Sequence, residues 1–385
     1  MNKIRISKNE PCPCGSGVVY KNCCYKKKDS EMDTTHTKKV LLDISRKFDS
    51  MKFKECLHPC KGECKPPIKA AHSIQNHGVL SLISKKNHVI AFPTEKTNPA
   101  SLLIDSNGLY FRKLELVGVN DATKHTCFCN YHDSKVFSPI ENNLNGFLKS
   151  DIEQIFLYAY KAFSFEYYKS KVALLGMQEL FKMLPHKLTT YPFLYIPHYR
   201  EAQKKDIEMK YYKEYFDEAL MSKNYDDLYT EIIEIPYKIE FATIDCISPS
   251  FNILGEKVKQ FDKGQMRRMF LNIFPNKNSS FIILSCIKSD VNHFKKFIDT
   301  IKAAEFSLVQ NFLSMFIPIY SESMVINPLL WETWGTQGQL AFTHLCNLMG
   351  KDAIRMEIQL ANTMMAHNKL NVQLKGCKCD LFTRI

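Results

Sequence analysis

The feature that most constrains this chain is a run of cysteines close to its first residue. The stretch PCPCGSGVVYKNCC, residues 11–24, holds four cysteines, two prolines and two glycines. A segment this short cannot bury a hydrophobic core of its own, so its fold needs another source of stability. The whole chain has 385 residues and 14 cysteines, and nine of these lie before residue 130. In a reducing compartment, closely spaced cysteines are better explained as metal ligands than as disulfides.

The composition describes a folded protein that we expect in the cytoplasm. Hydrophobic residues make up 45% of the chain and aromatic residues 12%, as in ordinary globular domains. No run approaches about eighteen apolar residues, which predicts no membrane-spanning helix and no membrane partner. The first residues, MNKIR, lack the apolar core of a signal peptide.

The positive charge is concentrated in the cysteine-rich part. The formal net charge is +12, and residues 1–150 carry 24 Lys and Arg against 14 Asp and Glu, a net of +10. A basic segment of this kind is typical of proteins with an acidic partner, most often nucleic acid. A basic surface that only keeps the protein soluble explains the charge equally well.

The pattern of apolar and polar residues along the sequence predicts an α+β multidomain protein. We expect a knuckle at residues 1–26, a polar linker at 27–39, a small α+β unit at 40–148 and a mixed α/β body at 149–385. Motifs of nucleotide-binding and serine-hydrolase folds are absent, so the role of the body stays unassigned. Within the body, apolar periodicity predicts helices at 150–185, 205–221, 289–303, 307–316 and 338–349, and strands at 235–241, 269–274 and 280–287.

The first cysteine cluster has the composition of a tetrahedral zinc site. Four thiolates can surround one zinc ion, and Gly15 and Gly17 allow the tight turns between ligands. The stretch resembles the SEC-C motif, a zinc-binding motif of the SecA translocation ATPase that also occurs on many other bacterial proteins. The resemblance implies that the module docks onto a protein or a ribosome. It also implies the zinc ligands Cys12, Cys14, Cys23 and Cys24.

A second set of cysteines and histidines follows. Cys60 and Cys64 form one short pair, and Cys129 and His132 form another, separated by a long loop. Two such pairs are how a zinc ribbon is built, so we expect a second structural zinc site with these four ligands. Further candidates for the same site are Cys56, His58 and Cys127.

The order of elements across residues 56–142 resembles zinc-stabilised HNH endonucleases, which have a ββα-metal fold. The resemblance assigns His72, in the context Ala-His-Ser-Ile, as the general base for water, and Asp133 as a ligand of catalytic Mg²⁺ or Mn²⁺. Asn120 or Asn130 would orient the base. The chain departs from the family in its C-x3-C spacing and in carrying Asp133 where the family has a final His.

Each of these residues also has a structural explanation. His72 could be a satisfied polar group in a small zinc domain, or a zinc ligand in place of Cys60. Asp133 could cap the helix that follows His132. Two functions therefore stay open. One is a metal-dependent HNH-like endonuclease acting on nucleic acid, with a role in bacterial antiphage defence by analogy with other multidomain nucleases. The other is a non-catalytic zinc adaptor that binds protein, RNA or a ribosome. Cys377 and Cys379 are left unassigned.

Overall fold

A computed structural model describes residues 5–30, 53–65, 67–93, 113–142, 146–348, 350–370, 376 and 378–385. These residues fall into two compact units. The first contains the described residues up to Lys54 together with Glu166–Tyr215. The second contains the described residues from Glu55 to Phe165 together with Phe216–Ile385. The mixture of helices and strands confirms the predicted α+β class.

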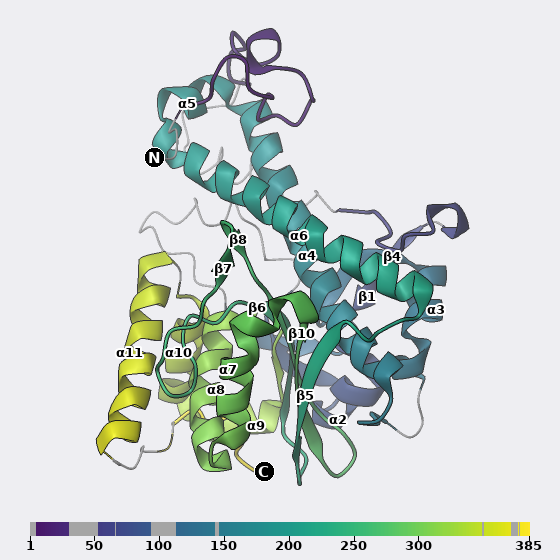
Figure 1. Cartoon of the computed structure of the whole chain (residues 1–385), viewed down its shortest axis with the longest axis vertical. Helices are drawn as coiled ribbons and strands as arrows, with labels where there is room; N and C mark the ends of the chain where they lie inside the picture. The colour runs from purple at the N-terminus through teal and green to yellow at the C-terminus, as the bar shows by residue number, and fades with distance from the viewer. Residues whose placement is uncertain are drawn as a thin grey trace. The chain divides into compact units, whose positions relative to one another are not determined.

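The secondary structure of the described residues is as follows (Figure 1). The strands are β1 (Ile68–His72), β2 (His88–Ala91), β3 (Glu115–Gly118), β4 (Lys124–Cys129), β5 (Leu228–Ile235), β6 (Phe241–Ile247), β7 (Phe261–Asp262), β8 (Gln265–Met266), β9 (Met269–Pro275), β10 (Ser280–Ile287) and β11 (Val325–Ile326). The α-helices are α2 (Ser81–Ile83), α3 (Asn130–Glu141), α4 (Ile152–Met183), α5 (Pro185–Thr190), α6 (Ile196–Ser222), α7 (Val291–Ala303), α8 (Phe306–Tyr320), α9 (Pro328–Thr333), α10 (Gly335–Cys346) and α11 (Gly350–Leu370). Shorter turns are η1 (Tyr20–Asn22), η2 (Lys61–Glu63), η3 (Asn76–Leu80), η6 (Pro192–Leu194) and η7 (Lys288–Asp290).

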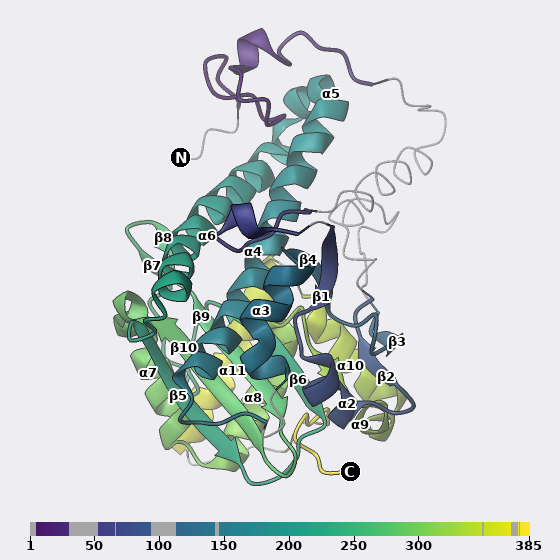
Figure 2. The same ribbon diagram turned by 90° about the vertical axis from the view of Figure 1, so that its right-hand side faces the viewer.

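The second unit is built on an antiparallel sheet. Within the described residues, seven strands pair in the order β3-β2-β11-β6-β9-β10-β5. Strands β2 and β3 precede residue 148, yet they extend the sheet formed by strands of the C-terminal body. Strands β1 and β4 pair separately as a two-stranded antiparallel sheet, and α3 packs against both of them (Figure 2).

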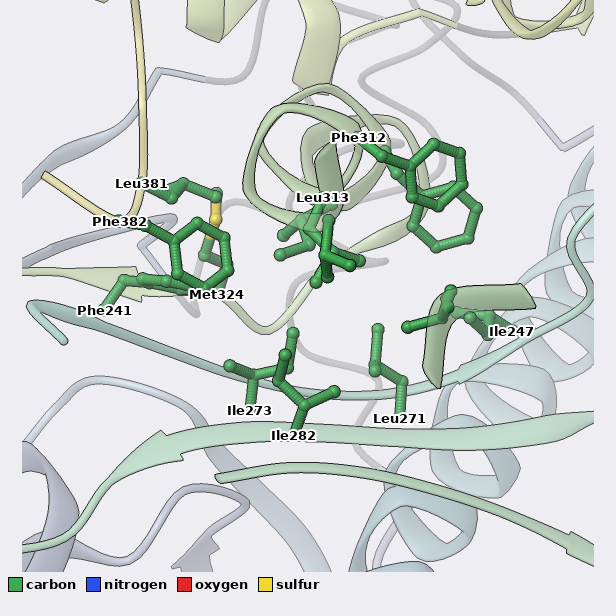
Figure 3. Packing of buried hydrophobic residues seen from close by; sticks show 14 of the residues in the cluster. Phe241, Ile247, Leu271, Ile273, Ile282, Phe312, Leu313, Met324, Leu381 and Phe382 are labelled. Atoms are coloured by element: carbon green, nitrogen blue, oxygen red, sulfur yellow. The ribbon is translucent and has the colours of Figure 1, made fainter. Parts of the chain in front are cut away.

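The main core lies between this sheet and the helices that follow it. Leu271 and Ile273 of β9 and Ile282 of β10 face Phe312 and Leu313 of α8 (Figure 3). Helix α7 contributes further phenylalanines to the same cluster. These side chains are almost completely buried, so the helices and the sheet are held together chiefly by the hydrophobic effect.

The intervening residues of β9 point to the opposite face of the sheet, as the two-residue period of a strand requires. Phe274 stacks on Tyr158 of α4 with ring centroids 4.5 Å apart. Phe270 meets Phe216 of α6 edge to face at 5.1 Å. The beginning of α4 and the end of α6 therefore cover the second face.

The first unit joins the N-terminal knuckle to the remaining parts of α4 and α6. Tyr20 packs edge-on against Phe181 of α4 at 6.0 Å, and Tyr195 lies 5.3 Å from the same ring. Asp29 accepts a hydrogen bond of 2.9 Å from the backbone N–H of His186 at the start of α5. The other buried members of this small core are Cys12, Cys14, Cys24, Leu180, Met183, Ile196 and Tyr199.

One predicted strand is wrong, while others are close to those observed. The strands predicted at 269–274 and 280–287 correspond to β9 and β10. The strand predicted at 235–241 is instead the connection between β5 and β6. Pro236 interrupts it because proline cannot donate to a strand ladder. The hydroxyl of Ser280 then holds the connection, accepting from the N–H of Ile239 and donating to the carbonyl of Tyr237.

The end of the chain returns to the main core. Leu381 and Phe382 are buried, and the Phe382 ring lies 5.2 Å from that of Phe241. Cys379 is buried, and its thiol donates to the carbonyl of Gly338 at 3.2 Å. Cys377 lies outside the described residues. Among the helices that the structure describes, none combines the length and the apolar character needed to cross a membrane.

Candidate metal centres and candidate active site

The cysteines of the N-terminal knuckle form a group of metal donors. The sulfur atoms of Cys12, Cys14, Cys23 and Cys24 all lie within 4.8 Å of one another. Cys23 Sγ is 3.5 Å from Cys14 Sγ and 3.7 Å from Cys24 Sγ. With Zn–S bonds of about 2.3 Å, the edge of a regular tetrahedron is roughly 3.8 Å. The four sulfurs thus have the spacing that one zinc ion requires.

Tight backbone turns bring these sulfurs together. The N–H of Cys12 donates to the carbonyl of Val18 at 2.8 Å and closes the knuckle. Gly15 and Gly17 have φ of +74° and +75°, a region that favours glycine. At Gly15 a Cβ would also lie 2.6 Å from the side chain of Gln178. The glycines predicted to allow the turns therefore have the backbone conformation that glycine favours.

A second group of donors combines Cys56, Cys64, Cys129 and His132. The Nδ1 atom of His132 lies 3.4 Å from Cys56 Sγ, 3.6 Å from Cys64 Sγ and 3.3 Å from Cys129 Sγ. Zn–S bonds of about 2.3 Å and a Zn–N bond of about 2.0–2.1 Å place sulfur and nitrogen roughly 3.6 Å apart in a tetrahedron. The group therefore fits zinc bound by three thiolates and one imidazole.

Local structure explains the place of the last two donors. Cys129 ends β4 and is the N-cap of α3, where its sulfur accepts from the backbone N–H of His132 at 3.5 Å. The C-x2-H spacing thus puts both side chains at the start of one helix. This N-cap position is taken by the cysteine itself, and Asp133 lies in the first turn of the helix.

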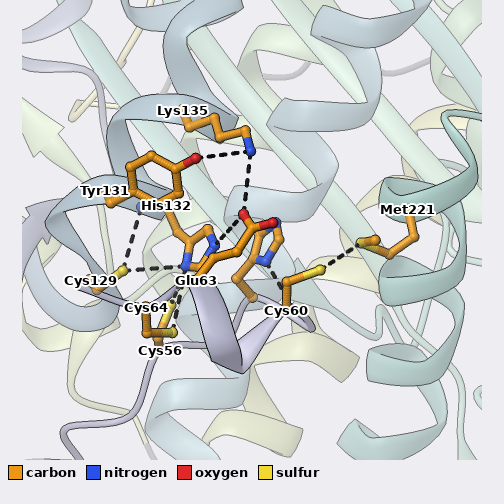
Figure 4. Close-up of polar contacts among 10 residues, drawn as sticks. Cys56, Cys60, Glu63, Cys64, Cys129, Tyr131, His132, Lys135 and Met221 are labelled. Carbon is orange, nitrogen blue, oxygen red and sulfur yellow. Dashed lines mark hydrogen bonds and ion pairs between the residues drawn. The ribbon is translucent and has the colours of Figure 1, made fainter. Parts of the chain in front are cut away.

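Cys60, the predicted partner of Cys64, is not a member of this group, and Cys56 takes its place. The Cys60 thiol donates instead to the sulfur of Met221 at 3.5 Å (Figure 4). Cys60 and Cys64 flank the 3-10 turn Lys61–Glu63. Both cysteines have non-helical backbone conformations, with ψ of 75° at Cys60 and 130° at Cys64, so the turn does not hold their side chains on one face. Spacing alone does not reveal this turn.

A carboxylate and a second imidazole surround the His132 ring. Glu63 Oε2 lies 3.7 Å from His132 Nε2, on the side away from the sulfurs (Figure 4). Lys135 holds the same carboxylate oxygen at 3.4 Å. The His58 ring stacks on His132 with centroids 3.8 Å apart, and its Nδ1 accepts from the N–H of Cys60 at 3.1 Å. A carboxylate behind a metal-binding histidine is a common feature of zinc sites.

Burial disfavours ionisation of the thiols in both groups, and hydrogen bonds oppose this effect at one cysteine of each group. Burial raises the pKa of Cys12 and that of Cys64 to about 11. Hydrogen bonds lower the pKa of Cys14 to about 7, and they also lower the pKa of Cys129. Several thiolates in so small a volume would repel one another. A bound divalent cation would compensate this charge, so the donor chemistry agrees with the geometry.

A register shift interrupts the pairing of β1 and β4 between His72 and the residues that meet α3. His72 is paired with Lys124, and cross-strand partners point to the same face. Phe128 is paired with Lys69, three residues before His72 on β1, and therefore points to the opposite face. The Phe128 ring lies 5.3 Å from that of Phe137 on α3.

The side chain of His72 is held by a backbone carbonyl. Its Nδ1 lies 2.8 Å from the carbonyl oxygen of Ala122, which can only accept, so Nδ1 carries the proton. In the neutral ring Nε2 then has a free lone pair. Burial lowers the pKa of His72, which favours this neutral form. The adjacent Thr123 has φ of +56°, which is strained for a β-branched residue.

Among the described residues, neither of the amides considered for orienting His72 is hydrogen-bonded to it. The Asn120 side-chain oxygen accepts from the Asn76 amide at 3.1 Å. Asn130 is exposed at the first position of α3. The carbonyl of Ala122, which no sequence motif marks, has the orienting contact instead.

Asp133, Phe137 and Glu141 follow one another at four-residue intervals along α3, which places them on one stripe of the helix. The Oδ1 atom of Asp133 is buried and has no hydrogen-bond partner among the described residues. Burial raises the pKa of this carboxyl to about 6. Lys161 of α4 forms an ion pair with Glu141, and its ammonium lies 4.9 Å from the Phe137 ring centroid.

Comparisons with known proteins match the N-terminal knuckle. The family model of the SEC-C motif matches residues 9–26. The Protein translocase subunit SecA of Wolinella succinogenes is 61% identical over 23 residues, which cover 6% of this chain and 3% of that protein. No solved structure matches the chain. The likeness of residues 56–142 to HNH endonucleases stays a prediction. The chain thus carries a SEC-C motif, with cysteines able to bind metal.

Proposed function

We propose that this protein binds two structural zinc ions and hydrolyses phosphodiester bonds of nucleic acid at a site containing His72 and Asp133. The observation that carries the proposal is the hydrogen bond from His72 Nδ1 to the Ala122 carbonyl. It leaves Nε2 of the neutral ring available to take a proton from water, which is the task of a general base.

The surroundings of Asp133 support a role as a metal ligand. A buried carboxylate oxygen without a hydrogen-bond partner is costly unless a bound ion or molecule interacts with it. Carboxylate oxygens are the ligands that Mg²⁺ and Mn²⁺ prefer. A divalent ion held there would neutralise charge that builds on the phosphate during hydrolysis.

The two residues lie on neighbouring secondary-structure elements. His72 ends β1, and Asp133 lies in the first turn of α3, which packs on β1 and β4. The second group of zinc donors joins the residues before β1 to the start of α3. A structural zinc ion would therefore fix the same elements that carry the proposed catalytic groups.

Plasmid cleavage tests this proposal. Zinc-loaded protein is incubated with supercoiled plasmid, phage genomic DNA or RNA, in Mg²⁺ or Mn²⁺. We expect cleavage of at least one substrate, and loss of about 10²–10⁴-fold in rate for His72→Ala. His88→Ala is the matched control, because His88 Nδ1 also contacts a backbone carbonyl, that of Lys86, at 2.7 Å. No cleavage by the unmodified protein, or equal loss in both variants, would refute the catalytic role.

The SEC-C match favours a second function, a non-catalytic adaptor. Near the knuckle, Val18 is 46% and Tyr25 is 40% exposed, and the segment is rich in lysine. Such a surface suits docking onto a protein or ribosome. Two results together would favour the adaptor. The protein would co-sediment with ribosomes and lose this binding in Cys24→Ser, and it would cleave none of the nucleic acids tested.

A further inference from the structure

The first unit carries three aromatic rings that are largely exposed to solvent. Tyr25 of the knuckle is 40% exposed, Tyr191 at the end of α5 is 54% exposed, and Phe193 in η6 is 61% exposed. The rings of Tyr191 and Phe193 meet edge to face, with centroids 6.4 Å apart. Exposed apolar groups that gather in one place are typical of an interaction site, whereas isolated ones are common on any surface.

Buried contacts join the segments that carry these rings. The Tyr25 ring meets Tyr20 edge to face at 5.5 Å, and Tyr20 belongs to the same small core as Phe181 and Tyr195. Tyr195 directly follows η6. The end of the knuckle is also tied to α5, because the carboxylate of Asp29 accepts from the first two N–H groups after Pro185 and the N–H of Ser30 donates to the carbonyl of Met183. The exposed rings therefore lie on one folded body.

The knuckle surrounds its exposed ring with positive charge. Residues 5–30 contain six Lys and Arg against two acids, a net of +4. The two acids are already engaged, since Glu10 forms an ion pair with Arg200 and Asp29 binds the start of α5. The Lys8 ammonium lies 4.4 Å from the Tyr25 ring centroid. All six cations are exposed, and none of them forms an ion pair within the described part of the chain: Arg5, Lys8, Lys21, Lys26, Lys27 and Lys28.

The segment that carries the other two rings is also free of negative charge. Residues 184–200 contain no Asp or Glu. The exposed residues of α5 before its end are His186, Lys187 and Thr190, so this helix has a polar outer side. A helix that lies on a membrane instead presents a continuous apolar face. The surface therefore combines separate aromatic rings with cations.

We propose that this surface binds single-stranded nucleic acid, with the rings of Tyr25, Tyr191 and Phe193 stacking on bases and the lysines at 26–28 contacting phosphates. Aromatic rings beside cations are the two components of single-strand binding without sequence preference. The bases of a duplex are stacked on one another, so only unpaired bases can stack on protein rings. The inference goes beyond the proposed function, because this binding requires neither His72 nor Asp133.

The test measures the affinity of the zinc-loaded full chain for fluorescent RNA and DNA strands of about 20 nucleotides. Fluorescence anisotropy is recorded over a series of salt concentrations, without Mg²⁺ or Mn²⁺. Tyr191→Ala and Phe193→Ala should each weaken binding by about 5–100-fold and leave its salt dependence unchanged, because stacking releases no counterions. The triple exchange of the lysines at 26–28 for glutamine should reduce the slope of log K against log salt by about 2, since each phosphate contact contributes about 0.7.

Matched controls come from the second unit. Phe261 of β7 is 42% exposed, and Phe261→Ala should leave the affinity unchanged. Lys257, Lys259 and Lys263 are exposed near the same strand, and their exchange for glutamine should leave the salt dependence unchanged. All of these substitutions are at exposed side chains, so we expect each variant to keep its zinc content and its circular dichroism spectrum.

Four results would overturn the proposal: no binding of any single strand, equal loss of affinity in Phe193→Ala and Phe261→Ala, equal affinity for a duplex of the same length, or binding of anionic vesicles or polyglutamate in place of the oligonucleotides. The last result would assign the surface to a membrane or to an acidic protein. His72→Ala should bind single strands as the unmodified protein does. Absence of plasmid cleavage would therefore refute the proposed function alone, and absence of single-strand binding with cleavage retained would refute this inference alone.

Discussion

The second donor group contains Cys56 where the sequence predicted Cys60, and this difference can be tested directly. Replacing Cys56 with serine removes a buried sulfur that lies 3.4 Å from His132 Nδ1. Loss of an outer-shell partner already costs about 10–100-fold in metal affinity, so we expect a loss of at least about 100-fold for a ligand. This corresponds to about 2.7 kcal/mol of binding free energy, which is coupled to folding in structural zinc sites.

Cys60→Ser is the matched control for this experiment. It makes the same chemical change four residues from Cys64, but it breaks only the contact with Met221. Zinc content is measured by mass spectrometry after dialysis against graded concentrations of chelator. We expect two zinc ions per chain in the unmodified protein and in Cys60→Ser, and about one in Cys56→Ser. Loss of zinc from Cys60→Ser with retention in Cys56→Ser would refute the assignment of ligands.

Three other predictions concern the surroundings of the donors and the candidate base. Glu63→Gln removes the carboxylate 3.7 Å from His132 Nε2 and should weaken zinc binding at the second group by about tenfold, measured by competition with a chelator; unchanged affinity would contradict this role. Gly15→Ala and Gly17→Ala both force an unfavourable φ and should each destabilise the knuckle by about 1 kcal/mol, as judged by hydrogen exchange, because the atoms that a Cβ would meet at Gly15 are the movable end of the Gln178 side chain. No loss of stability in either variant would argue against this role of the glycines. Because burial lowers the pKa of His72 below its unfolded value near 6.5, its contribution to stability is complete above that pH and is lost as the pH falls through the folded pKa. The difference in unfolding free energy between the unmodified protein and His72→Gln should therefore change between pH 7 and 5 in urea titrations, and a constant difference would rule out this linkage.

Long periodic segments of the fold could be predicted from sequence, but their partners could not. The strands Met269–Pro275 and Ser280–Ile287 follow from continuous apolar runs. The addition of β2 and β3 to the same sheet depends on contacts across more than 100 residues, which periodicity does not encode. The connection at Pro236 could have been predicted from the sequence. The alternating apolar residues there favour a strand, but proline disfavours one.

The local chemistry of this protein follows from the order of its residues. The knuckle at residues 11–24 needs metal because it is too short to own a core, and its glycines allow the turns that gather four sulfurs. The C-x2-H spacing likewise places Cys129 and His132 together at one helix start. These features depend on neighbours along the chain, where spacing is a reliable guide to distance.

Which distant residues meet depends on how the elements pack in three dimensions. This packing brought Cys56 rather than Cys60 to the second donor group, and it placed the carbonyl of Ala122 beside His72. It also buried Lys161 against the stripe of α3. The physical reason is the same in each case: a side chain's direction is set by the turn or strand that carries it and by the elements packed against it, and neither is visible in residue spacing.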